Sequence, residues 1–134
     1  MRAFLLLAAL PLAAQAQTVP PDEWTAAVNG NTAVYFDEGR VVRREYWLGS
    51  VFGFSLRMQD HTGECYDGIA LVENEMVCIA WPARDGEVCQ VSEQGEHGLF
   101  TVHSYNFVGD PLDTPPLQME IVPGDVACGM EQVG

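Results

Sequence analysis

Residues 32–58 read TAVYFDEGRVVRREYWLGSVFGFSLRM. Short runs rich in Val, Tyr, Phe and Trp are interrupted at Asp37-Glu38-Gly39 and at Leu48-Gly49-Ser50. This pattern is typical of antiparallel strands joined by tight turns. Because the connections are short, consecutive strands should lie side by side. The stretch therefore predicts a β-meander.

The same pattern continues toward the C-terminus. Further hairpin turns are expected at Glu73-Asn74-Glu75 and Gln94-Gly95-Glu96. We expect eight strands in all, at Thr32–Phe36, Val41–Leu48, Val51–Met58, Gly68–Val72, Met76–Trp81, Glu87–Ser92, Leu99–Phe107 and Gln118–Val122. The predicted fold is all-β, a single antiparallel meander curled into a small barrel or sandwich.

One short helix is expected before the first strand, over Pro20–Asn29. Prolines stand at its entry, acidic residues fill its first turn, and Gly30 follows its end. Trp24, Ala27 and Val28 have the i, i+3, i+4 spacing of a single helix face. We therefore expect this face to pack against the β-domain.

Residues 1–16 have the three parts of a secretory signal peptide. Arg2 supplies the positive start, an apolar run extends from Ala3 to Leu12, and Ala14-Gln15-Ala16 resembles a signal-peptidase site. The run is far shorter than the ~20 residues that a membrane-spanning helix needs. The sequence predicts export to the periplasm or the outside of the cell, no membrane anchor, and a mature domain of residues 17–134.

The mature chain is strongly acidic. Without Arg2, one of the six basic residues, it keeps five Arg, no Lys and 19 acidic residues, a net charge of −14. Such a charge disfavours nucleic acid, whose phosphates are bound by Lys and Arg. The length suits one domain. We expect a monomer whose acidic surface keeps it in solution.

Four cysteines in an exported chain favour two disulfides over a metal site or a catalytic thiol. If the strands Met76–Trp81 and Glu87–Ser92 form a hairpin, Cys78 and Cys89 lie opposite each other, within disulfide reach. Cys65 and Cys128 then remain to tie the tail to the body. The predicted pairs are Cys78 with Cys89 and Cys65 with Cys128.

The chain resembles a set of small exported bacterial proteins of unknown function. The likeness covers residues 24–92 and is carried by Gly30-Asn31-Thr32, Glu45-Tyr46, Gly63-Glu64-Cys65 followed by Gly68, Val77-Cys78-Ile79, and Cys89. The chain departs from the pattern at Ala70, Ile79 and Gln90, where aromatic residues are usual. The resemblance implies the fold and the export, and it implies no catalytic residue or cofactor.

Candidates for chemistry are few. The sequence has no motif that would activate a serine, so no catalytic residue is assigned. His61, His97 and His103 are weak metal-ligand candidates, because their spacing does not bring them together. A metal-handling protein and a small secreted hydrolase remain as alternatives, but the sequence favours a binding domain over an enzyme.

Three of the five mature arginines occur together on one predicted hairpin arm. Arg40, Arg43 and Arg44 stand beside Tyr46 and Trp47, and Arg and Trp are residue types that often anchor interfaces. Pairing with nearby acids and protection of a sheet edge explain the same pattern without a partner. The favoured functional hypothesis is an exported binding or interaction domain for a protein or small ligand, with these five residues as candidate contacts.

Overall fold

The computed structural model describes residues 17–50, 53–83 and 86–128. The predicted signal peptide, residues 1–16, lies outside the described residues. The elements are β1 (Gln17–Thr18), α1 (Pro21–Val28), β2 (Asn31–Asp37), β3 (Arg40–Ser50), β4 (Gly53–Asp60), β5 (Cys65–Glu73), β6 (Met76–Ala80), β7 (Glu87–Gln94), the 3-10 turn η1 (Glu96–Gly98), β8 (Leu99–Tyr105) and β9 (Leu117–Pro123).

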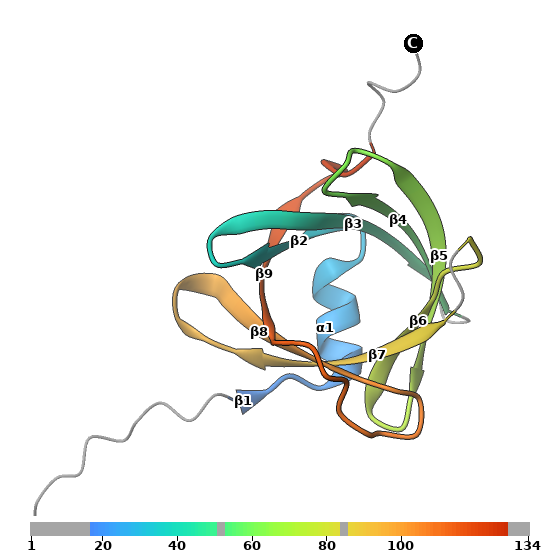
Figure 1. Ribbon diagram of the computed structural model, residues 1–134, viewed down its shortest axis with the longest axis vertical. Helices are drawn as coiled ribbons and strands as arrows, with labels where there is room; N and C mark the ends of the chain where they lie inside the picture. The colour runs from blue at the N-terminus through green and yellow to red at the C-terminus, as the bar shows by residue number, and fades with distance from the viewer. Residues whose placement is uncertain (1–16, 51–52, 84–85, 129–134) are drawn as a thin grey trace, which may run out of the picture.

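The strands β2 to β9 form a closed antiparallel barrel. Each strand pairs with the next along the chain, and β9 pairs back with β2. Figure 1 shows the resulting ring. Closure removes the exposed sheet edges that an open meander would leave. Of the two architectures that the sequence allowed, the barrel is the one observed.

All eight predicted strands are confirmed, with shifted ends, except that Val51, the expected start of the third strand, lies outside the described residues. The turn expected at Leu48-Gly49-Ser50 is wrong, because Leu48, Gly49 and Ser50 pair with Ser55, Phe54 and Gly53 and so extend β3. Two other hairpins turn at the residues whose backbone allows it. Glu38–Gly39, between β2 and β3, and Asn74–Glu75, between β5 and β6, have the positive φ values that two-residue turns require. The sequence signals did not predict β1, which pairs with the end of β7.

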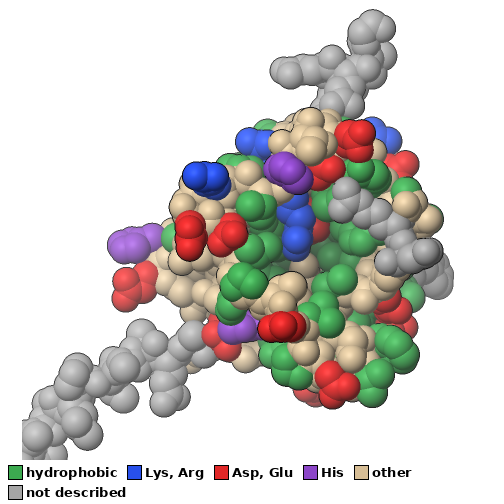
Figure 2. Space-filling model, viewed as in Figure 1, with side chains coloured by type: hydrophobic (Ala, Val, Ile, Leu, Met, Phe, Trp, Pro, Cys, Tyr) green, Lys and Arg blue, Asp and Glu red, His purple; other side chains and the backbone are tan. Residues whose placement is uncertain are grey.

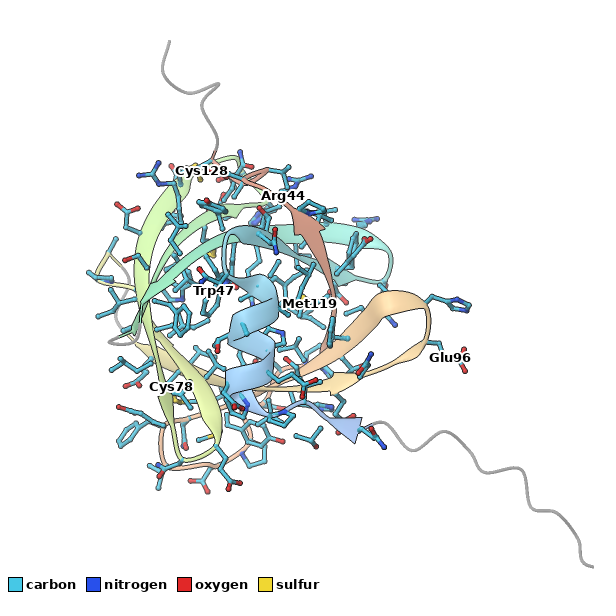
Figure 3. All side chains as sticks on the ribbon, turned by 180° about the vertical axis from the view of Figure 1, so that it is seen from behind. Arg44, Trp47, Cys78, Glu96, Met119 and Cys128 are labelled. Atoms are coloured by element: carbon cyan, nitrogen blue, oxygen red, sulfur yellow. A yellow bond between two sulfur atoms is a disulfide. The ribbon has the colours of Figure 1, made fainter. Side chains whose placement is uncertain are left out.

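The helix α1 closes one end of the barrel. It lies within the ring of strands in Figure 1 and in front of them in the reverse view of Figure 3. Trp24, Thr25 and Val28 are buried, whereas Asp22 and Glu23 stay exposed. The predicted packing face is therefore confirmed for Trp24 and Val28 and wrong for Ala27, which is exposed. With eight residues in α1, no described helix has the length and apolarity needed to cross a membrane.

The main hydrophobic cluster includes two side chains of this helix, Trp24 and Val28. The rings of Trp24 and Trp47 meet edge to face, 4.9 Å between centroids. The amide of Gly30 donates to the carbonyl of Trp47, which fixes the helix end to β3. Met119 belongs to the same cluster, and Figure 3 labels it on the other side of α1 from Trp47. This end of the barrel is filled with apolar side chains.

Both predicted disulfides are present. Cys78 and Cys89 are direct cross-strand partners on β6 and β7. The bond between Cys65 and Cys128 holds the tail after β9 against the outside of the barrel. On the way, the hydroxyl of Thr32 donates to the carbonyl of Gly124 at 2.6 Å and accepts the amide of Val126 at 3.0 Å. The tail is thus a packed part of the domain.

Candidate functional site

The end of the barrel opposite α1 holds a cavity of about 370 Å³. Figure 2 looks into it and shows a basic side chain at the centre of a hollow framed by hydrophobic groups. Volumes of this size are typical of small-molecule sites. The cavity is lined by Val42, Arg43, Glu45, Met58, Asp60, His61, Ile79, Trp81, Gly86, Val88, Gln90 and Ser104.

An irregularity in β3 brings two consecutive residues to this cavity. Tyr35 pairs with Arg43 but Phe36 pairs with Val41, so Val42 is an extra residue in the ladder. In a regular strand, neighbours point to opposite faces. The bulge instead lets both Val42 and Arg43 line the cavity. Bulges of this kind often re-aim side chains beside functional sites.

Arg43 and Glu45 form an ion pair on the cavity wall. The Nε atom of Arg43 lies 3.2 Å from Oε2 of Glu45. The two partners differ in exposure, since the side chain of Arg43 is 26% exposed and that of Glu45 only 1%. The guanidinium carbon also lies 4.0 Å from the ring centroid of Tyr35, in cation–π contact. The cation therefore faces the cavity and the carboxylate lies behind it.

The Glu45 carboxylate is poorly satisfied. Neither of its oxygens accepts a hydrogen bond of good geometry from the described residues, although the side chains of Tyr35, Trp47 and Arg43 lie close enough to the carboxylate to lower its pKa. Burial raises the pKa of Glu45, and the charge of Arg43 offsets this only in part. A buried carboxylate held in this way costs stability. Such costs are typical of functional sites.

Burial lowers the pKa of Arg43, but the charges and hydrogen-bonding contacts of Glu45 and Tyr35 together outweigh it, and the pKa is raised. The guanidinium is therefore a permanent cation. Burial raises the pKa of Tyr35 well above its ordinary value, and the Glu45 charge adds to this. Tyr35 is thus a neutral hydroxyl, which donates to Oε1 of Gln90 at 3.1 Å. Gln90 in turn lines the cavity, so the ring under Arg43 is braced from β7.

The rim beside the cavity is an ordered loop between β4 and β5. The Oδ1 atom of Asp60 accepts the hydroxyl of Thr62 at 2.6 Å and the amides of Thr62 and Glu64 at 2.8 and 3.1 Å. The Thr62 hydroxyl chiefly accounts for the lowered pKa of Asp60. Asp60 therefore organises the rim as a carboxylate, with His61 next to it at the mouth.

The remaining walls are mainly apolar. Met58, Ile79, Trp81 and Val88 contribute side chains from β4, β6, the segment after β6, and β7. Trp81 packs directly on the backbone of Gly68, where any β-carbon would overlap the indole ring. The glycine on β5 thus makes room for an aromatic wall. The site combines one accessible cation with a mostly hydrophobic surface.

The five predicted contact residues divide between two faces of β3. Arg43 and Trp47 point into the barrel, as described above. Tyr46 lines a shallow outer groove with Leu48, Arg57 and Asp125, and Arg44 alternates with the inward Arg43 and Glu45. Arg40 is exposed at the start of β3. The structure does not bring the five residues together on one surface.

The three histidines are also dispersed. His61 lies at the cavity mouth, His97 in η1, and His103 on β8, where its Nε2 is 3.4 Å from Oε2 of Glu93. Among the described residues, the side chains close enough to share a metal are Cys78, Glu87 and Cys89. Both of those sulfurs are bonded to each other, which removes them as ligands.

Sequence reasoning missed Glu45, Tyr35 and Gln90 as site residues. A signal for Glu45 was available, because it stands two residues from both Arg43 and Trp47 and shares their face of the strand. An acid on the same strand face as an expected core residue indicates a buried charge. Comparisons with protein-family models, with curated protein sequences and with solved structures gave no match for this chain.

Proposed function

We propose that the protein is an exported small-ligand-binding domain whose site is the open end of the barrel. The observation that carries this proposal is the cavity of about 370 Å³ with a desolvated ion pair in its wall. At about 30 Å³ per water molecule, this volume corresponds to about 12 waters. Its ligand is thus a compound with roughly that number of non-hydrogen atoms. Eight-stranded barrels can hold one such molecule.

Binding is favoured over catalysis by the arrangement of the polar groups. Ser104 and His61 line the same cavity, but no hydrogen bond joins them among the described residues. Nucleophilic catalysis requires a base within hydrogen-bond reach of the hydroxyl. The carboxylate of Glu45, whose pKa is raised by burial, is paired with Arg43 and 1% exposed, which suits positioning better than proton transfer to a substrate.

Export is supported by the disulfides and by the N-terminal sequence. Two disulfides fit an oxidising compartment. The apolar run followed by Ala14-Gln15-Ala16 has the features of a signal peptide that directs export. The resemblance to small exported bacterial proteins agrees with export and stays a prediction. A protein partner on the outer face near Arg40, Arg44 and Tyr46 also stays a prediction.

Calorimetric titration with octanol, a neutral probe of suitable size, tests the proposal. Two variants fill the cavity, Val88→Trp and Ser104→Phe, and Ile69→Trp is the matched control on the exposed outer face. We expect one-to-one binding to the unaltered protein, weakened by about tenfold or more in both filled variants. The control should bind as before. Absence of octanol binding, or equal binding by filled and control variants, would contradict the proposed site.

A further inference from the structure

The described lining of the cavity offers a ligand a single permanently cationic side chain, beside the carboxylates of Glu45 and Asp60. Arg43 is the only Lys or Arg among the described residues that line it. Its side chain is 26% exposed, whereas its partner Glu45 is 1% exposed. A bound molecule therefore meets the positive member of the pair first. The negative member fixes the position of the guanidinium from behind.

The contacts of Arg43 leave the outer part of the guanidinium for recognition. Glu45 approaches at Nε, and the Tyr35 ring covers one face of the group. The two terminal nitrogens form a planar fork that matches a carboxylate. Because Gln90 holds the Tyr35 hydroxyl at 3.1 Å, the platform beneath the guanidinium is itself fixed. The donor set is arranged before any ligand arrives, which reduces the entropy cost of binding.

The acidic groups nearby are engaged elsewhere. Glu45 faces Arg43, and Asp60 is turned into its own loop by Thr62 and Glu64. An organic cation would have to displace one of these interactions. The apolar wall of Met58, Ile79, Trp81 and Val88 suits the body of the ligand instead.

We propose that the ligand is an amphipathic monocarboxylate whose carboxylate binds the Arg43 guanidinium and whose apolar body packs against Met58, Ile79, Trp81 and Val88. The inference rests on the proposed binding function and names its ligand class. The acidic surface of the chain repels such an anion at long range. Salt screens that repulsion over ~8 Å at physiological ionic strength, so recognition is decided inside the cavity.

Three probes with the same eight-carbon tail isolate the head group: octanoate, octanol and octylamine. At neutral pH, we expect octanoate to bind the unaltered protein about 10-fold to 100-fold more tightly than octanol, as for a hydrogen bond to a charged group. Octylamine should bind no more tightly than octanol. Calorimetry, or tryptophan fluorescence to which Trp81 at the cavity wall contributes, provides the dissociation constants.

Variants of two neighbouring arginines test whether Arg43 causes the preference for octanoate. Arg43→Gln should abolish the octanoate preference and retain octanol binding, whereas Arg44→Gln, on the other face of β3, should keep both. If Arg43→Gln does not fold, Arg43→Lys keeps the charge without the planar fork, and the octanoate-to-octanol ratio should fall in part. Octanol binding without any head-group preference would overturn the inference and leave the proposed function standing. Preference for octylamine, or equal effects of the two Gln variants, would also overturn it. Failure of all three probes to bind would overturn both.

Discussion

The two ends of the barrel are built from the same strand in opposite ways. On β3, Trp47 lies under α1 with its ring against Trp24, within the main cluster of buried apolar side chains. Four residues earlier, ~13 Å along the strand, Arg43 stands over an open cavity with a buried acid at its side. One end gains stability from packing. The other holds polar groups at a cost, which is what a binding site requires.

The largest expected contrast between the two ends is in packing. Trp47→Ala should lower the free energy of unfolding by about 3–5 kcal/mol, because it removes a fully buried ring from a filled core. Trp81→Ala at the open end should cost about 1–2 kcal/mol, since its half-buried ring already borders empty space. Urea unfolding of both variants measures the difference. Equal losses would mean that the open end is packed as tightly as the closed one.

The disulfides provide the next contrast, and both lie near the cavity. Cys65 begins β5 just after the Asp60 rim, and Cys78–Cys89 lies beside the lining residues Ile79, Val88 and Gln90. With sequence separations of 63 and 11 residues, the chain-entropy relation gives upper estimates of about 4.3 and about 2.8 kcal/mol. We therefore expect Cys65→Ala/Cys128→Ala to lower the melting temperature more than Cys78→Ala/Cys89→Ala.

Alternatively, the Cys65–Cys128 bond only holds in place a C-terminal tail that contributes little to the stability of the domain. The bonds from Thr32 to Gly124 and Val126 argue against this, since they hold the tail independently of the bridge. Melting curves of the two double variants decide the matter. A smaller loss for the longer bridge would favour the tail-fastening role.

More of the fold than of the candidate site could be predicted from the sequence. Strand alternation, turn residues and hairpin pairing are local signals, and they gave the strands and the Cys78–Cys89 pair. The bulge at Val42 breaks that alternation, and no residue in the stretch signals it. The pairing of β9 with β2, which turns a meander into a closed barrel, is a contact between distant segments. The cavity depends on both features, so its lining was missed.

The open end should also make the stability of the domain depend on pH, through the buried carboxyl of Glu45. Because burial raises the pKa of Glu45 above its ordinary 4.5, the folded protein keeps a proton that the unfolded chain releases. Stability from this group is therefore lost as the pH rises between the two values. The slope for one proton cannot exceed about 1.4 kcal/mol per pH unit.

The Glu45→Gln variant has no carboxyl group at this position, so it should lack the pH-dependent part of the free energy of unfolding that Glu45 causes. Chemical unfolding from about pH 4 to about pH 8 should show the variant gaining stability relative to the unaltered protein as the pH rises. Asp60 has a lowered pKa and acts with the opposite sign, below its ordinary 3.8. A constant difference between the two proteins across the range would contradict the raised pKa of Glu45.

The smallest effect is expected on the outer face of β3, and it separates two adjacent arginines. Arg44→Glu should change the free energy of unfolding by only ~0–1 kcal/mol, as for exposed ion pairs. Arg43→Glu would instead place a second carboxylate beside Glu45, 1% exposed, and should destabilise the domain far more.

A double charge reversal at Arg43 and Arg44 therefore cannot serve as a stability-neutral test of an acidic partner. Arg44→Glu together with Arg40→Glu can, because Arg40 is exposed and Arg44 alternates with the inward residues. If the outer face binds an acidic protein, this pair of changes should weaken that binding and leave octanol binding and the melting temperature almost unchanged. A large loss of stability in Arg44→Glu alone would show that this side chain supports the barrel and that the two faces of β3 are less distinct than the structure indicates.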